Sequence, residues 1–283
     1  MRKIPDLLRQ GEQILLEAGN ENPREEARLL FEGETGLDRN RRLRDNINTV
    51  DEAVAAAFLA AVDERSKGRP LQYILGQWDF CGRSFFVGEG VLIPRPETEM
   101  LVEFALDYLK TSPCAKVLDL CAGSGCIGLT VAAEAPDATV ILLEKSPDAL
   151  KYLQKNKETL GLANAHIVAG DLFDGPAAYS IEHADVLLSN PPYIADEQVP
   201  LLQAEVQKEP VMALAGGTDG LDFYRAIAAK WLPAVNEGGL IALECGEEQT
   251  EAVAGLLAAY CDNVACHRDF QNLPRAVTAK KLR

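Results

Sequence analysis

Residues 190–193 read Asn-Pro-Pro-Tyr and directly follow an apolar run, residues 185–189, that is typical of a buried strand. Open α/β sheets hold their ligands at the carboxyl ends of such strands. Because proline donates no backbone N–H, the Asn190 side-chain oxygen and the Pro191 carbonyl are acceptors that no strand ladder claims. The pattern predicts a site for a planar NH2 group, with Tyr193 beside it. The alternative is a rigid turn in which Tyr193 belongs to the core.

A second pattern, residues 117–128, has the order strand, glycine loop, helix. Gly123 and Gly125 let the backbone approach a ligand, and the helix N-terminus offers unpaired N–H groups. Together with Gly128 they match the dinucleotide pattern G-x-G-x-x-G, so nicotinamide binding is an alternative. Asp119 inside the strand favours an ammonium-bearing ligand such as S-adenosylmethionine, because a carboxylate there would repel a pyrophosphate. The other interpretation is that Asp119 only caps the loop.

Two more acidic residues follow the next predicted strands. Glu144 ends one of them, where a carboxylate can accept both ribose hydroxyls of a nucleoside. Asp171 follows another strand and is placed to accept an adenine amino group, with Leu172 and Phe173 as an apolar wall. A single aromatic residue such as Phe173 is more often part of the core.

The chain around these motifs alternates predicted strands and helices. Strands are expected at residues 116–120, 139–143, 166–168, 185–189 and 240–243 and in a terminal region, and helices at residues 97–109, 126–134, 147–160, 221–232 and 249–259. Apolar strands alternating with helices predict an α/β fold with a doubly wound, mostly parallel sheet that has helices on both faces.

The residues before this region predict two further parts. Residues 1–75 have helical periodicity and form a small helical domain, in which Pro23 begins one helix, Gly36 ends it, and Thr49 with Glu52 forms a capping box for another. Residues 76–96 form a hairpin linker that turns at residues 81–83. The catalytic domain then covers residues 97–283.

Composition limits the functional classes. The chain has 283 residues, 47% of them hydrophobic, and 43 acidic against 28 basic residues give a net charge of −15. This charge argues against stable nucleic-acid binding, and the basic cluster at residues 39–44 reads as a solvated helix end or loop. The seven cysteines form no C-x-x-C pair, so we expect neither a disulfide framework nor a metal site. No signal peptide or membrane span is predicted, and we expect a cytoplasmic monomer.

The chain resembles the release-factor glutamine N5-methyltransferases, a class I S-adenosylmethionine-dependent family, along nearly its whole length. The matching motifs are residues 70–76 (Pro-Leu-Gln-Tyr-Ile-Leu-Gly), 93–99 (Ile-Pro-Arg-Pro-Glu-Thr-Glu), 190–194 (Asn-Pro-Pro-Tyr-Ile), 205–206, 209–210, 213–214, 216–221 and 243–246. The family has glycine where Cys121 stands and aspartate where Glu144 stands.

The resemblance implies a Rossmann-like sheet of seven strands, a site and a substrate. S-adenosylmethionine would contact the glycine loop and the acidic positions already described, namely Asp119, Cys121, Ala122, Gly123, Ser124, Gly125, Glu144, Asp171, Leu172 and Asn190. The glutamine of the Gly-Gly-Gln motif in class 1 release factors would bind Asn190, Pro191, Pro192 and Tyr193, with Asn190, Pro191 and Tyr193 catalytic. Residues 1–75 would add a second recognition surface. No metal is expected. No general base is expected either, because S-adenosylhomocysteine leaves as a neutral group and the proton can depart after methyl transfer.

Two other functional classes remain open from the sequence. An adenine methyltransferase of DNA or RNA uses the same Asn-Pro-Pro-Tyr motif for a similar NH2 group, but needs a basic surface that this acidic chain lacks. A nicotinamide oxidoreductase rests on the glycine pattern alone.

Overall fold

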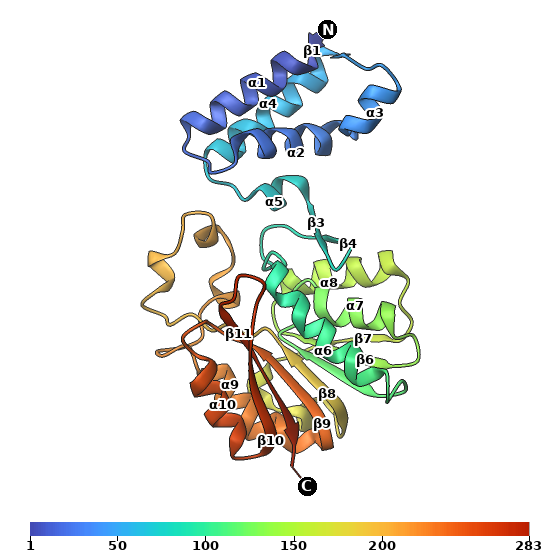
Figure 1. Cartoon of the computed structure of the whole chain (residues 1–283), viewed down its shortest axis with the longest axis vertical. Helices are drawn as coiled ribbons and strands as arrows, with labels where there is room; N and C mark the ends of the chain where they lie inside the picture. Colours follow the sequence, from blue (N-terminus) through green and yellow to red (C-terminus); the bar gives the residue numbers. More distant parts are fainter. Residues whose placement is uncertain (283) are drawn as a thin grey trace. The chain divides into compact units, whose positions relative to one another are not determined.

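The computed structural model describes residues 1–282, which divide into two compact units (Figure 1). The first unit contains residues 1–77 and a short distant segment, residues 203–208. The second contains residues 78–202 and 209–282. Within the described residues, every helix is too short or too polar to cross a bilayer.

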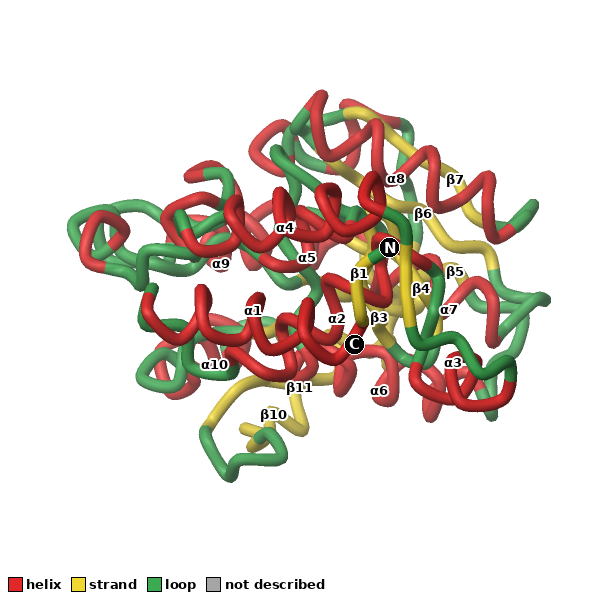
Figure 2. Tube along the Cα trace, turned by 90° about the horizontal axis from the view of Figure 1, so that it is seen from above, coloured by secondary structure: helices red, strands yellow, loops and turns green. Residues whose placement is uncertain are grey.

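The first unit is a helical bundle. Its long helices α1 (Ile4–Glu17), α2 (Pro23–Thr35) and α4 (Glu52–Ser66) lie side by side in both views (Figures 1 and 2). Their apolar faces bury Leu7, Leu30 and Phe58, and the Phe58 ring meets Phe31 edge to face at 5.6 Å. Shorter elements complete the unit: α3 (Arg39–Arg44), α5 (Leu71–Leu75), β1 (Arg2–Lys3) and β2 (Thr49–Val50).

The segment 203–208 is joined to this unit by a buried ion pair. The Arg65 guanidinium, only 3% exposed, donates to Glu26 at 2.7 Å and also to Glu205. Two carboxylates around one guanidinium leave little of its charge unpaired, which is a condition for burying arginine. The sequence periodicity did not predict that residues 203–208 belong to the first unit.

The helix ends in this unit follow local chemistry, with one correction. Helix α2 begins at Pro23 and ends at Gly36, whose φ of 64° is the left-handed conformation that glycine adopts without strain. The predicted capping box of Thr49 and Glu52 is wrong. The N-cap of α4 is Asp51, whose carboxylate accepts the Val54 N–H at 2.8 Å, while Thr49 pairs with Lys3 in the β1–β2 ladder.

The predicted hairpin is formed by β3 (Gln77–Phe80) and β4 (Arg83–Phe86) and, apart from Gln77, belongs to the second unit. The two turn residues both have positive φ, 47° at Cys81 and 70° at Gly82. This geometry matches the twist of the flanking strands, which is why two-residue hairpins favour it.

The predicted sheet of seven strands follows. It has the order β10-β11-β9-β8-β5-β6-β7, and its strands are β5 (Lys116–Leu120), β6 (Thr139–Glu144), β7 (Ala165–Ala169), β8 (Ala184–Ser189), β9 (Val235–Glu244), β10 (Cys261–Arg268) and β11 (Pro274–Lys281). Pairing is parallel from β7 to β9, whereas β11 runs antiparallel to both β9 and β10. Because the chain winds outward from β5 in both directions, the sheet is doubly wound.

Helices cover both faces of this sheet (Figure 1). Alternate residues of each strand face opposite sides, so Val117 and Val186 join one core and Leu118 and Leu187 the other. The first core is closed by α6 (Glu99–Leu109), α7 (Cys126–Glu134) and α8 (Pro147–Leu160). The second is closed by α9 (Asp222–Ala226), the π-helical turn Ile227–Trp231 and α10 (Thr250–Ala258).

The predicted helix 221–232 is not one regular helix. It is α9, then the π-helical turn, then a 3-10 turn at Leu232–Ala234. Pro233 has no N–H to continue an α-helix, and the buried Trp231 ring is fixed because its Nε1 donates to the Leu172 carbonyl at 2.8 Å. The Trp231 hydrogen bond and Pro233 together account for the change from an α-helix to π-helical and 3-10 turns.

Candidate active site

Strand register brings the predicted site residues to one edge of the sheet. Leu120 at the end of β5 pairs with Leu143 of β6 on one side and with Ser189 of β8 on the other. The next residues along the chain, Cys121, Glu144 and Asn190, therefore leave the sheet at the same level. This is the carboxyl edge on both sides of β5, where the direction of winding reverses and α/β sheets bind ligands.

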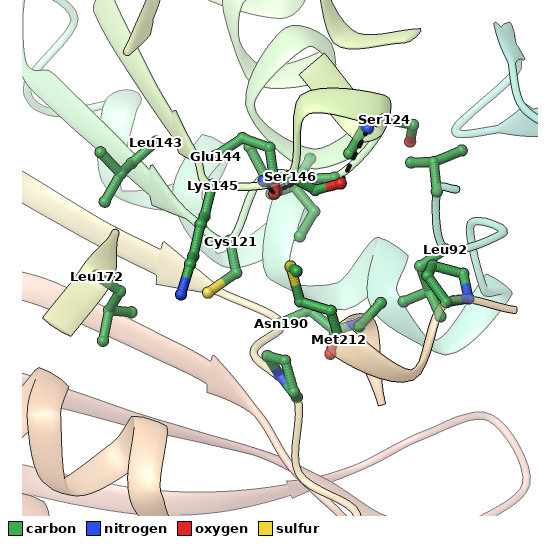
Figure 3. Close-up of a pocket in the computed structure, with 18 of the residues that line it drawn as sticks. Leu92, Cys121, Ser124, Leu143, Glu144, Lys145, Ser146, Leu172, Asn190 and Met212 are labelled. Carbon is green, nitrogen blue, oxygen red and sulfur yellow. Dashed lines mark hydrogen bonds between the residues drawn. The ribbon is translucent and has the colours of Figure 1, made fainter. Parts of the chain in front are cut away.

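A pocket lies at this edge (Figure 3). Nine of the predicted site residues line it: Cys121, Ala122, Gly123, Ser124, Glu144, Asp171, Leu172, Asn190 and Pro192. Figure 3 shows the labelled side chains of Cys121, Glu144 and Asn190 around the same space. Asp119, Gly125, Pro191 and Tyr193 are not among its lining residues.

Glu144 is held by backbone donors. One of its carboxylate oxygens accepts the Gly123 N–H and the other accepts the Ser146 N–H, each at 2.7 Å. A carboxylate has about four lone-pair sites, so each oxygen keeps capacity for one more donor. The two bonds fix the plane of the carboxylate against the pocket, which suits a ligand with neighbouring hydroxyl groups.

The loop between β5 and α7 needs unusual backbone angles. Cys121, Gly123 and Gly125 all have positive φ, at 60°, 57° and 82°. The family's glycine at the position of Cys121 has a physical reason, since a side chain is strained in this conformation. Gly125 faces inward, because a Cβ there would lie 2.3 Å from Cδ1 of Leu153. The structure thus places Gly125 behind the pocket wall, where it permits close packing of α7 on α8.

Asp119 is fully buried in β5. Its Oδ2 accepts the Gly128 N–H of α7 at 2.9 Å, and its Oδ1 has no partner among the described residues. Burial, with a smaller contribution from the charge of Glu144, raises the pKa of Asp119 from 3.8 to about 7. Asp119 and Gly128 are not among the pocket-lining residues, so the geometry gives this one hydrogen bond the role of tying α7 to the sheet. Its role toward an ammonium group stays a prediction.

Asp171 lies in a polar corner of the pocket. Its carboxylate pairs with Lys145 at 2.7 Å and caps the Phe173 N–H at 3.0 Å. Although partial burial acts to raise it, these donors hold the pKa of Asp171 below its usual value. Phe173 also lines the pocket and meets Phe223 with ring centroids 5.0 Å apart. This corner offers a charged acceptor beside an aromatic wall, which matches the needs of an adenine ring.

The Asn190 side chain, directly after β8, is held by a residue from another part of the chain. Its Nδ2 donates to the Thr98 hydroxyl at 3.2 Å, and the Thr98 hydroxyl donates to the Glu244 carboxylate at 2.6 Å. Thr98 lines the pocket as well. Because Thr98 binds the NH2 group of Asn190, the Asn190 Oδ1 takes no part in this contact.

Tyr193 is tied to the sheet's second core. Its carbonyl accepts from Gln249 Nε2 at 2.9 Å, and its ring packs against that core. Burial, with the charge of Glu244, raises the pKa of its phenol. A role for Tyr193 and Pro191 in holding a substrate stays a prediction, as neither lines the pocket described here.

Several pocket residues were not predicted as site residues. Thr98, Arg95, Lys145, Met212 and Phe223 line it, and the buried Glu209 joins two of its walls by accepting the Ile93 N–H at 3.0 Å and pairing with Arg95. Thr98, Arg95 and Glu209 belong to the family motifs at residues 93–99 and 209–210, and these motifs could have identified them as site residues. Among residues 1–282, no group of three or more histidine, cysteine or acidic side chains could hold a metal ion.

Comparison with known proteins adds independent information. A family model described as the PrmC N-terminal domain matches residues 6–76, and one described as the methyltransferase small domain matches residues 98–215. A solved structure titled the hMettl16 catalytic domain in complex with MAT2A 3′UTR hairpin 6 has a TM-score of 0.57 at 15% identity, covering 82% of this chain and 83% of that one. At this identity the likeness shows the fold alone.

Curated relatives are much more similar. The release factor glutamine methyltransferase of Clostridium acetobutylicum is 36% identical over 280 residues, which is 98% of each chain. The enzyme of the same name from Geobacter sulfurreducens is 40% identical over 93% of this chain and 90% of its own length. The one from Escherichia coli is 35% identical over 92% and 93%. Because this similarity extends across both units and the whole pocket, the chain belongs to the release factor glutamine methyltransferase family.

Proposed function

We propose that this methyltransferase transfers a methyl group from S-adenosylmethionine to the side-chain amide nitrogen of glutamine in the Gly-Gly-Gln motif of class 1 release factors. The products are N5-methylglutamine and S-adenosylhomocysteine. The observation that carries the proposal is the position of Asn190, an anchored amide in the same pocket as Glu144 and the glycine loop.

The residues present fit S-adenosylmethionine. The fixed Glu144 carboxylate has lone pairs for the two ribose hydroxyls, and Asp171 with Leu172 and Phe173 suits the adenine ring. The loop Cys121–Gly125 would lie against the methionine part. S-adenosylmethionine supplies an electrophilic methyl group on a sulfonium, so the chain needs no metal for this reaction.

The chain's task is to present a weak nucleophile. A glutamine amide nitrogen shares its lone pair with the carbonyl, so it reacts only when it is held in line with the methyl group. Asn190 Oδ1 and the Pro191 carbonyl would accept its two N–H bonds and stabilise the positive charge that develops there. The amide proton can leave after transfer, which is why no general base is assigned.

The helical unit is proposed as a second recognition surface for the release factor. It has its own core and matches the PrmC N-terminal domain, and the curated relatives cover it as well. A surface away from the chemistry would add binding area for an intact protein and none for a short peptide.

The test is labelling by mass spectrometry. The chain is incubated with a class 1 release factor and isotopically labelled S-adenosylmethionine, and the label should appear on the glutamine of Gly-Gly-Gln. Duplex DNA and a structured RNA serve as parallel acceptors and should take no label. Labelled adenine in either nucleic acid, with an unlabelled release factor, would overturn the proposal.

A further inference from the structure

Two hydrogen bonds connect Asn190 to residues from distant parts of the chain. Ser189 pairs with Leu243 in the β8–β9 ladder, so Glu244 at the end of β9 lies at the level of Asn190. Thr98, directly before α6, bridges them: it accepts from Asn190 Nδ2 at 3.2 Å and donates to Glu244 at 2.6 Å. Thr98 and Asn190 line the pocket, whereas Glu244 lies behind them, 1% exposed.

The direction of these bonds decides which edge of the Asn190 amide is available. A threonine hydroxyl has one proton, and here that proton goes to the Glu244 carboxylate. Only oxygen lone pairs then face Asn190, which must turn its NH2 group toward Thr98. Its Oδ1 is left for a ligand. The opposite rotamer would place NH2 against a substrate NH2, two donors facing each other.

We propose that Thr98 and Glu244 are positioning residues, which hold the Asn190 amide with its oxygen turned toward the substrate nitrogen. This rests on the proposed function, since it takes the substrate group at Asn190 to be an NH2 donor. Neither residue needs to touch the reacting atoms. They act by making one of two nearly isosteric amide orientations the stable one.

Burial makes this selection strict. Thr98 is 2% exposed, so water cannot easily replace its hydroxyl as the acceptor for Asn190. Without the Thr98 hydroxyl, Glu244 would lose a hydrogen-bond donor. The Asn190 amide would at the same time lose its preference for one orientation. Thr130 on α7 offers a matched control: it is equally buried, but its hydroxyl has no hydrogen-bond partner among the described residues.

The arrangement also predicts a pH dependence. Burial raises the pKa of Glu244 from 4.5 to about 7. The charged and titratable groups around it are Arg95, Glu97, Tyr193, Tyr224, Cys245 and Arg275. A protonated Glu244 can donate to Thr98, whose own proton is then directed to Asn190 and favours the wrong amide orientation. Turnover should therefore fall as pH drops through about 7.

The kinetic test uses the full chain, intact release factor and saturating S-adenosylmethionine. Thr98→Val should lower kcat at least about tenfold, with KM for the release factor and calorimetric affinity for S-adenosylhomocysteine near those of the wild type. Thr98→Ser should restore most of the turnover, and Thr130→Val should keep it. Glu244→Gln, which cannot ionise, should lose the acid limb of the pH profile. A natively folded Thr98→Val that keeps its kcat, or a Thr98→Ser as defective as Thr98→Val, would overturn the inference.

A second readout needs no activity. The Asn190 side-chain NH2 resonance, assigned from its loss in Asn190→Asp, should shift with a midpoint near pH 7 in the wild type and stay constant in Glu244→Gln. If the wild type does not methylate release factor, the proposed function fails, while this titration still decides whether Glu244, through Thr98, sets the orientation of the Asn190 amide. A resonance that does not titrate in the wild type, or that titrates alike in Glu244→Gln, would refute this positioning role. Because this comparison needs only the wild type and Glu244→Gln, it gives a result even if Thr98→Val does not fold.

Discussion

Replacing Asp119 by asparagine should remove a large pH dependence from the stability of the second unit. The carboxylate is fully buried in β5, and its pKa is raised from 3.8 to about 7, chiefly by burial. The folded state therefore keeps a proton that the unfolded chain releases above 3.8. This contribution to stability is fully present below that pH and is lost as pH rises through about 7.

The size of the effect follows from the shift. A rise of about 3 pKa units, at about 1.4 kcal/mol per unit, corresponds to about 4 kcal/mol over the whole titration. More than half of this falls between about pH 5 and about pH 8. Asparagine keeps an oxygen for the Gly128 N–H but does not ionise, so this slope should be absent from Asp119→Asn. The two N–H donors of the asparagine amide cost free energy to bury, and this cost does not depend on pH.

Urea unfolding at the two pH values measures the slope for wild type and variant. The free energy of unfolding of the wild type should decrease relative to that of Asp119→Asn as pH rises. Glu244→Gln is a positive control, because burial also raises the pKa of Glu244 from 4.5 to about 7. A difference between wild type and Asp119→Asn that stays constant, or changes in the opposite direction, would refute the reasoning.

Four further predictions concern the proposed function. Asn190→Ala should lower turnover by on the order of 10²-fold with little change in S-adenosylhomocysteine affinity, measured by initial rates and calorimetry; an equal loss of both would make Asn190 a cofactor or folding residue. Glu144→Ala should raise KM for S-adenosylmethionine more than it lowers kcat, because ribose contacts act alike in ground and transition states. NADH should not displace S-adenosylhomocysteine, and displacement would revive the oxidoreductase alternative. A Gly-Gly-Gln peptide should be methylated much more slowly than intact release factor in parallel rate measurements, and equal rates would leave the helical unit without a recognition role.

The sequence alone determined most helices and strands of the second unit, though not the succession of turns after residue 221, and it determined the edge of the sheet at which the pocket lies. Strand β5 and helices α7 and α8 have the predicted bounds, because apolar periodicity, Pro147 and the glycines are local signals that act on neighbouring residues. Placing Cys121, Glu144 and Asn190 together required only the rule that parallel strands share a carboxyl edge.

Local signals were weaker where two residues compete for one role. Thr49 and Asp51 can both cap α4, and the ladder with Lys3 takes Thr49. Glycine spacing likewise could not distinguish Gly123, which lines the pocket, from Gly125, which packs behind it against Leu153. Each of these choices depends on a neighbour from another element.

Only the tertiary structure decided which partners surround the site. Asn190 meets Thr98 across 92 residues and Thr98 meets Glu244 across 146, and Arg65 draws residues 203–208 into the helical unit. No periodicity encodes such contacts, since they depend on how whole helices and strands pack. A buried polar group must find a donor or acceptor after packing has excluded water, and packing alone determines which residue is within reach.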